Sequence, residues 1–126
     1  ADAKLIMNMM LANLLQAMVE GMVFARKAGL DPALFIEAYK LNAGYSALAD
    51  MKLGKMLQGD YSTHFSLKHM GKDIRLALER AGELKADCPL TRRLKEIISD
   101  GMAAGFGDED FSVLYRLARR NAGDSV

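Results

Sequence analysis

Two polar side chains near the start of the chain, Lys4 and Asn8, lie one helical turn apart at the head of an apolar row. At about 100° per residue, the row continues through core-type side chains at Leu11, Leu15, Val19 and Met22. A lysine and an amide at the angular position of a core need a polar destination, because burying either without a partner costs on the order of 1–3 kcal/mol. A cleft would supply one. The alternative is that the helix projects beyond the core at its first turn and leaves Lys4 in water.

The same helix carries a second polar stripe and many methionines. The stripe is typical of a solvated or partner-facing edge and contains Asn13, Gln16, Glu20 and Lys27. Thioether side chains fill irregular gaps, so the methionines from Met7 to Met22 are interpreted as core or dimer interface.

Helix boundaries recur along the whole chain, whereas the alternation of a half-buried strand never persists. The sequence therefore predicts an all-α, multi-helix domain of about six helices with a long first helix. Asp31 and Ser46 are expected N-caps, Pro32 and Pro89 begin helices, and Gly29 ends one. The expected helices span about 2–28, 31–44, 46–57, 66–85, 89–104 and 111–120, and the last residues are expected to fray.

The fourth expected helix is strongly two-sided. Its apolar face, with steps of three and four residues, contains Leu67, Met70, Ile74, Ala77, Leu78, Ala81 and Leu84. Its opposite face contains Lys68, Lys72, Arg75 and Glu79. Without further information this charged face is simply a solvated one.

Composition bounds the class of protein. A length of 126 residues suits one domain, and 51% hydrophobic with 26% charged residues is typical of a globular protein. The formal net charge of +1 argues against nucleic acid and anionic membrane surfaces as partners. The lone Cys88 suits a reducing compartment, so we expect a cytoplasmic protein. Asn8 and Asn13 interrupt the apolar opening stretch, so a signal peptide or membrane span is not expected.

Two groups of residues of metal-ligating type are not expected to bind a metal ion. Asp108, Glu109 and Asp110 lack the ligand count and spacing of a calcium loop, so they are expected to cap the sixth helix. His64 and His69 have no third ligand at zinc-like spacing and are interpreted as surface or packing residues.

Four short segments, in order along the chain, resemble the β-hydroxyacid dehydrogenase family, which includes 3-hydroxyisobutyrate dehydrogenase. They are Lys4-Leu5-Ile6-Met7-Asn8, Ala28-Gly29-Leu30-Asp31, Phe65-Ser66-Leu67-Lys68-His69-Met70-Gly71-Lys72-Asp73 and Gly105-Phe106-Gly107-Asp108-Glu109-Asp110-Phe111-Ser112. The resemblance spans nearly the whole chain.

The resemblance implies a two-domain enzyme, of which residues 1–126 resemble only the C-terminal helical half, like the C-terminal domain of 6-phosphogluconate dehydrogenase. In such enzymes a Rossmann domain binds NAD or NADP, and the helical domain closes the cleft and forms the dimer. No strand followed by Gly-x-Gly-x-x-Gly occurs here. We therefore expect the Rossmann domain to be absent from this chain, no cofactor to bind to the chain alone, and no turnover by it.

By resemblance, Lys4 is the catalytic lysine and Asn8 the substrate-orienting asparagine. An ammonium group can stabilise and protonate the alkoxide that hydride transfer creates. The family often has a second asparagine where Met7 stands here, so contacts from that amide are in doubt. Lys72 resembles the lysine that reaches the cofactor, and Phe65 and Asp73 match cleft positions, for which core anchoring of a loop and a local ion pair are the respective alternatives.

Within the family, Phe65 to Met70 and Met9-Met10 look most like the glyoxylate and succinic semialdehyde reductase branch. Small carboxylated aldehydes or hydroxy acids are the implied substrates, with 3-hydroxyisobutyrate and tartronate semialdehyde as alternatives. The choice between NAD and NADP depends on the other domain. Two further hypotheses are a helical module that only dimerises and a helical DNA-binding regulator, which near-neutral charge disfavours.

Overall fold

The computed structural model describes all 126 residues, which form six α-helices and one short 3-10 helix. The α-helices are α1 (Asp2–Lys27), α2 (Pro32–Tyr39), α3 (Ala47–Gln58), α4 (Leu67–Glu83), α5 (Pro89–Ala103) and α6 (Leu114–Asn121), and the 3-10 helix spans Phe111–Val113. The only β-type pairing is one isolated antiparallel bridge between Ser66 and Asp110. The predicted all-α class and order of six helices are confirmed.

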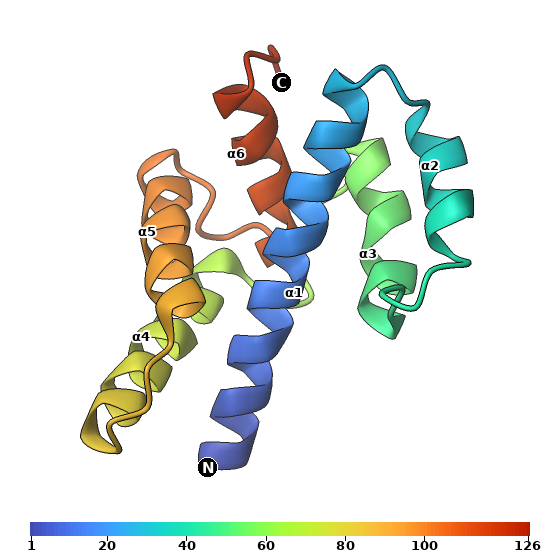
Figure 1. Cartoon of the computed structure of the whole chain (residues 1–126). Helices are drawn as coiled ribbons and strands as arrows, with labels where there is room; N and C mark the ends of the chain where they lie inside the picture. Colours follow the sequence, from blue (N-terminus) through green and yellow to red (C-terminus); the bar gives the residue numbers. More distant parts are fainter.

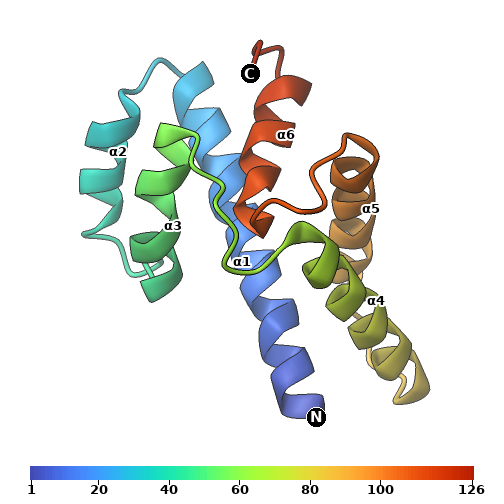
Figure 2. The same cartoon turned by 180° about the vertical axis from the view of Figure 1, so that it is seen from behind.

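Helix α1 is the central element of the fold. Helices α2 and α3 lie on one side of it, α4 and α5 lie on the other, and α6 lies beside its C-terminal half (Figures 1 and 2). The buried positions of α1 begin at Ala12, so its first turns extend beyond the core. By length and composition α1 could cross a membrane, a criterion that core helices of soluble proteins also meet.

One hydrophobic cluster of 22 buried residues joins all six helices. Its largest fully buried side chains include those of Tyr115, Phe111, Leu15, Leu53 and Met56. They come from α1, α3, α6 and the 3-10 helix, so the core fixes the position of α1 against both halves of the fold.

The two predicted N-caps, Asp31 and Ser46, are confirmed, and Ser66 is a third cap that the sequence analysis did not name. The side chains of Asp31, Ser46 and Ser66 accept hydrogen bonds from backbone N–H groups three residues later, at 3.1, 3.2 and 3.1 Å. Gly29 follows α1 with φ of 82°, a left-handed conformation that suits glycine. Local hydrogen bonding thus sets the start of three helices and the end of the longest.

Three local predictions differ from the structure: the end of α2, the burial of Leu84 and the start of α6. Helix α2 ends at Tyr39 instead of near Gly44, because the Asn42 side chain accepts from the Gly44 N–H and the Tyr39 hydroxyl donates to the Gly44 carbonyl. The Leu84 side chain, expected to be buried, is 60% exposed because the last turn of α4 extends past the core. The segment at 111 begins as a 3-10 helix, and α6 starts only at Leu114.

The C-terminal residues, which were expected to fray, contact the end of α1 through Asp124. Asp124 accepts a hydrogen bond from Arg119 at 3.0 Å and lies within ion-pair distance of Arg26 and Lys27. These contacts lower the pKa of Asp124, above all through the Arg119 hydrogen bond. The tail therefore closes over the end of α1.

Candidate functional site

A recess of about 440 Å³ opens between the N-terminal turns of α1 and α4. Eight residues line it: Ala1, Lys4, Leu5, Asn8, Phe65, His69, Lys72 and Asp73. All five residues predicted to act in the site are therefore around one recess. The individual roles assigned to them stay predictions.

Helical spacing explains how the two walls of the recess form. Lys4 and Asn8 are four residues apart on α1, and His69, Lys72 and Asp73 are spaced by three and four on α4. The Asn8 Nδ2 donates to Asp73 Oδ2 at 2.9 Å and joins the two walls directly. The recess is thus held together by the same polar side chains that line it.

The Lys4 side chain is exposed, although the sequence placed it on an apolar row. The row loses its burial before Ala12, because the first turns of α1 extend past the core. Both sequence interpretations therefore hold in part: the helix projects, and the projecting turns form one wall of a recess.

The recess favours anionic ligands. It contains the ammonium groups of Lys4 and Lys72 and one carboxylate, that of Asp73, which accepts a hydrogen bond from Asn8. Neither ammonium group has a carboxylate within 4.0 Å. The two lysines outnumber the single carboxylate, so the recess attracts a carboxylate or phosphate more strongly than a neutral ligand.

The loop that carries Phe65 is fixed by a buried ion pair that the sequence analysis did not find. Lys52 of α3 donates to Asp110 at 2.9 Å, and their side chains are 4% and 1% exposed. The other oxygen of Asp110 accepts from the backbone N–H of His64 and of Phe65, both at 3.1 Å. The Asp110 carboxylate therefore holds the turn that leads into α4.

Burial on its own would raise the pKa of Asp110. The hydrogen bonds from the Ser112 hydroxyl, from Lys52 and from backbone N–H groups outweigh it, so the pKa lies below its usual range. The carboxylate also accepts from the Ser112 N–H at 3.1 Å, so Asp110 caps the 3-10 helix at 111–113. Helix α6 itself has no side-chain cap, so the predicted capping of the sixth helix by the acidic segment is found only for this short 3-10 helix before it. No group of three or more His, Cys, Asp or Glu side chains is arranged to hold a metal ion.

His69 is a second residue whose place the sequence did not predict. Its side chain is exposed, as expected, but it lines the recess. Its Nδ1 lies 2.8 Å from the Ser66 hydroxyl, and its ring meets that of Phe65 edge-on at 6.5 Å. The spacing of His69 from Lys72 and Asp73 would have indicated the shared face.

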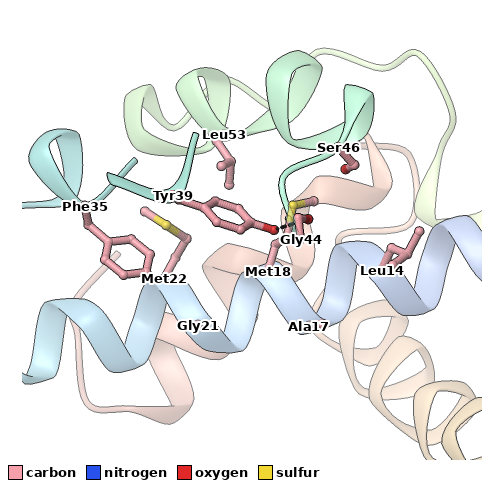
Figure 3. A pocket seen from close by; sticks show the side chains of 10 residues that line it. All are labelled: Leu14, Ala17, Met18, Gly21, Met22, Phe35, Tyr39, Gly44, Ser46 and Leu53. Atoms are coloured by element: carbon pink, nitrogen blue, oxygen red, sulfur yellow. Dashed lines mark hydrogen bonds between the residues drawn. The ribbon is translucent and has the colours of Figure 1, made fainter. Parts of the chain in front are cut away.

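A different hollow, of about 310 Å³, lies between α1 and the α2–α3 pair. Figure 3 shows Phe35, Tyr39 and Leu53 facing Met18 and Met22 of α1 across it. Its lining is mostly apolar, and the Tyr39 hydroxyl is occupied by the Gly44 carbonyl at 2.9 Å. It contains no acid or base suited to catalysis, and none of the predicted site residues lines it.

The fold is similar to that of one part of a solved structure. A TM-score of 0.85 relates 91% of the chain to 40% of the 3-hydroxyisobutyrate dehydrogenase of Salmonella typhimurium, at 23% sequence identity. At that identity the likeness concerns the fold alone.

Residues 1–118 match the family described as "NAD-binding of NADP-dependent 3-hydroxyisobutyrate dehydrogenase". The chain belongs to this family, as the four sequence segments predicted. It is 32% identical over 119 residues to glyoxylate/succinic semialdehyde reductase 2 of Arabidopsis thaliana, and 33% identical over 115 residues to the cytokine-like nuclear factor N-PAC of Anopheles gambiae. The matches cover 94% and 91% of this chain but only 33% and 20% of those relatives.

Proposed function

We propose that this chain is the helical substrate domain of an NAD(P)-dependent β-hydroxyacid dehydrogenase and that it acts together with a Rossmann domain in the cytoplasm. The observation that carries the proposal is the common recess of Lys4, Asn8 and Lys72. Family membership and the likeness to a glyoxylate/succinic semialdehyde reductase support it. Its substrates are small carboxylated aldehydes or the corresponding hydroxy acids. Glyoxylate and succinic semialdehyde come first, before 3-hydroxyisobutyrate and tartronate semialdehyde.

Lys4 is the proton donor of the reduction. As negative charge develops on the carbonyl oxygen, the Lys4 ammonium stabilises that oxygen and passes it a proton from Nζ. In the oxidation, the neutral amine accepts the hydroxyl proton. Asn8 gives one N–H to Asp73, so its carbonyl oxygen and its second N–H remain for the substrate.

Lys72, Phe65 and Asp73 would hold the dinucleotide on this side, and its nicotinamide, when bound, would supply or accept the hydride. The donor set fits such a group, because the Lys72 ammonium faces the recess without a carboxylate within 4.0 Å. Asp73 fixes Asn8 through the 2.9 Å hydrogen bond, so it orders the substrate side as well.

The test replaces Lys4 in the natural full-length protein and follows oxidation of the reduced nicotinamide with glyoxylate and succinic semialdehyde. Lys4→Met removes the proton donor at similar volume, so kcat should fall by about 10²–10⁴-fold while the protein still folds. Lys40→Met is the matched control, because Lys40 is an exposed lysine at the end of α2, away from the recess. Retention of more than a tenth of the activity by Lys4→Met would reject Lys4 as the acid.

The chain by itself should not catalyse hydride transfer. Mixing it with a separately produced Rossmann domain should restore hydride transfer, because the two walls of the cleft then meet. Measurable reduction of either aldehyde by the purified chain alone would contradict the proposal.

A second candidate function is a helical dimerisation module without catalysis. The similarity to a protein named as a nuclear factor favours it, as do the exposed apolar side chains of Met7, Met10, Leu14 and Phe24 along α1. A full-length protein that sediments as a homo-oligomer but leaves the aldehydes unreduced, both in the wild type and in Lys4→Met, would support this function instead.

A further inference from the structure

A second polar hollow, of about 480 Å³, runs between α4 and α5 beside the recess. The two helices lie next to each other in both views of the fold (Figures 1 and 2). Lys68, Lys72 and Arg75 line it from α4, and Lys95 and Ser99 line it from α5. We call this hollow the α4–α5 groove.

Helix geometry concentrates these side chains. Lys68, Lys72 and Arg75 stand at positions i, i+4 and i+7 of α4, which lie on one face. On α5, Lys95 and Ser99 are four residues apart. Gly71 allows the helices to approach closely, since a Cβ there would lie 3.1 Å from Cγ2 of Ile98, which is 3% exposed.

The charge of the groove is one-sided. It contains four formal positive charges and no carboxylate, in a chain whose net charge is only +1. Lys68 pairs with Asp108 at 3.1 Å, but Lys72, Arg75 and Lys95 have no ion-pair partner. Like charges at i and i+4 destabilise a helix, and only Lys68 of the Lys68–Lys72 pair has a carboxylate partner.

We propose that the α4–α5 groove binds a small molecule that carries phosphate groups. The Arg75 guanidinium offers a planar fork to phosphate oxygens, the lysines supply point charges, and the Ser99 hydroxyl supplies a neutral donor. The volume suits a small molecule, and the near-neutral chain has no extended field for a polyanionic polymer. Lys72 and His69 line both hollows, so the ligand lies next to the Lys4 recess without filling it.

The groove is a site in its own right and does not depend on the dehydrogenase assignment. Titration of the isotopically labelled chain with inorganic pyrophosphate at constant ionic strength should give saturable shifts of backbone amide signals, confined to residues 68–75 and 95–102. Arg75→Gln combined with Lys95→Gln should weaken this binding at least about tenfold, because two charge-assisted contacts are lost. Lys40→Gln combined with Lys55→Gln removes the same charge from the α2–α3 side and should leave affinity within about twofold.

The results of these titrations either support or overturn the proposed phosphate site. Equal weakening in the two double variants, or shifts that do not saturate, would mean general charge attraction and would overturn it. Lys4→Met should leave pyrophosphate affinity unchanged, and a loss there would mean that groove and recess are one site. A competition experiment with NADP+ and NAD+ identifies the natural ligand. If NADP+ displaces pyrophosphate and NAD+ does not, the groove binds a phosphate group of the dinucleotide. If neither displaces it, the groove binds a separate phosphorylated metabolite. Groove shifts with duplex DNA or anionic vesicles, but not with pyrophosphate, would refute a small-molecule ligand.

Discussion

Replacement of Lys52 by methionine should destabilise the chain by about 3 kcal/mol, because it leaves a buried carboxylate without its counter-charge. Lys52 is 3% exposed and donates to Asp110 at 2.9 Å. Methionine matches the unbranched stem and fills the same space, so the change tests the charge more than the packing.

The magnitude depends on the other donors to Asp110. Loss of one partner of a buried ion pair costs about 3–5 kcal/mol. The Asp110 carboxylate would still accept four hydrogen bonds, from the N–H groups of His64, Phe65 and Ser112 and from the Ser112 hydroxyl. These donors keep the anion solvated, so we expect a value near the lower limit. Asp110→Asn should cost at least as much, because its amide N–H groups would face the Lys52 ammonium and the Ser112 donors.

Urea unfolding followed by circular dichroism measures both effects. With an m-value of about 2 kcal/mol/M, the Lys52→Met midpoint should fall by roughly 1.5 M at unchanged slope. The double variant Lys52→Met with Asp110→Asn should lose about 1–3 kcal/mol less than the sum of the single changes, since no unpaired charge remains. A loss below about 1 kcal/mol for Lys52→Met, or strict additivity, would refute a stabilising role for the pair.

Two further predictions concern other parts of the chain. The hydrogen bond from Tyr45 to Asp50, at 2.7 Å, raises the pKa of Tyr45 to about 12, so its contribution to stability is present below pH 10 and is lost as pH rises towards 12. Asp50→Ala should return this pKa towards 10 in a spectrophotometric titration, and an unchanged phenol titration would refute the assignment. Gly101→Ala should lower the melting temperature, because its Cβ would lie 2.8 Å from Cδ2 of the fully buried Leu67, whereas Gly54→Ala at an exposed position of α3 should raise stability by about 0.5–1 kcal/mol. Equal effects of the two glycine replacements would show that propensity alone decides them.

Helix starts were readable from the sequence because capping is local. Asp31 and Ser46 each accept the expected hydrogen bond from the N–H group three residues later, and Ser66, where the fourth helix was expected to begin, accepts the same kind of bond. Helix ends were harder to predict, because they depend on competing hydrogen bonds such as that from the Gly44 N–H to the Asn42 side chain. The burial of a last turn also depends on how far the helix extends past the helices packed against it, as at Leu84. The fixed tail depends on Asp124 meeting Arg26 from the other end of the chain, and no local pattern predicts such a contact.

The site residues were predicted by resemblance to the family. The apolar row on α1 correctly pointed to a polar recess at Lys4 and Asn8, but it left open whether Lys4 is exposed. Lys4 heads an apolar row and is exposed, but Lys52 lies on the row of Leu48 and Met56 and is truly buried. The sequence signal is the same in both cases. The difference is that the first turns of α1, which carry Lys4, extend past the core, whereas the part of α3 that carries Lys52 is packed inside it. Asn13, assigned to a solvated or partner-facing edge, donates a hydrogen bond to Thr91 of α5 at 3.0 Å.

The buried pair also explains why the fourth family segment lies so far from the recess in sequence and still bears on it. Asp110 holds the Phe65 N–H, and the Phe111 N–H donates to the Phe65 carbonyl at 2.8 Å. The Leu67 and Lys68 N–H groups, which α4 cannot satisfy in its first turn, donate to the carbonyls of Glu109 and Gly107. The segment at 105–112 therefore fixes the start of α4, and α4 in turn presents His69, Lys72 and Asp73. The wall of the recess that α4 forms is in this way held by the ion pair between Asp110 and Lys52 of α3.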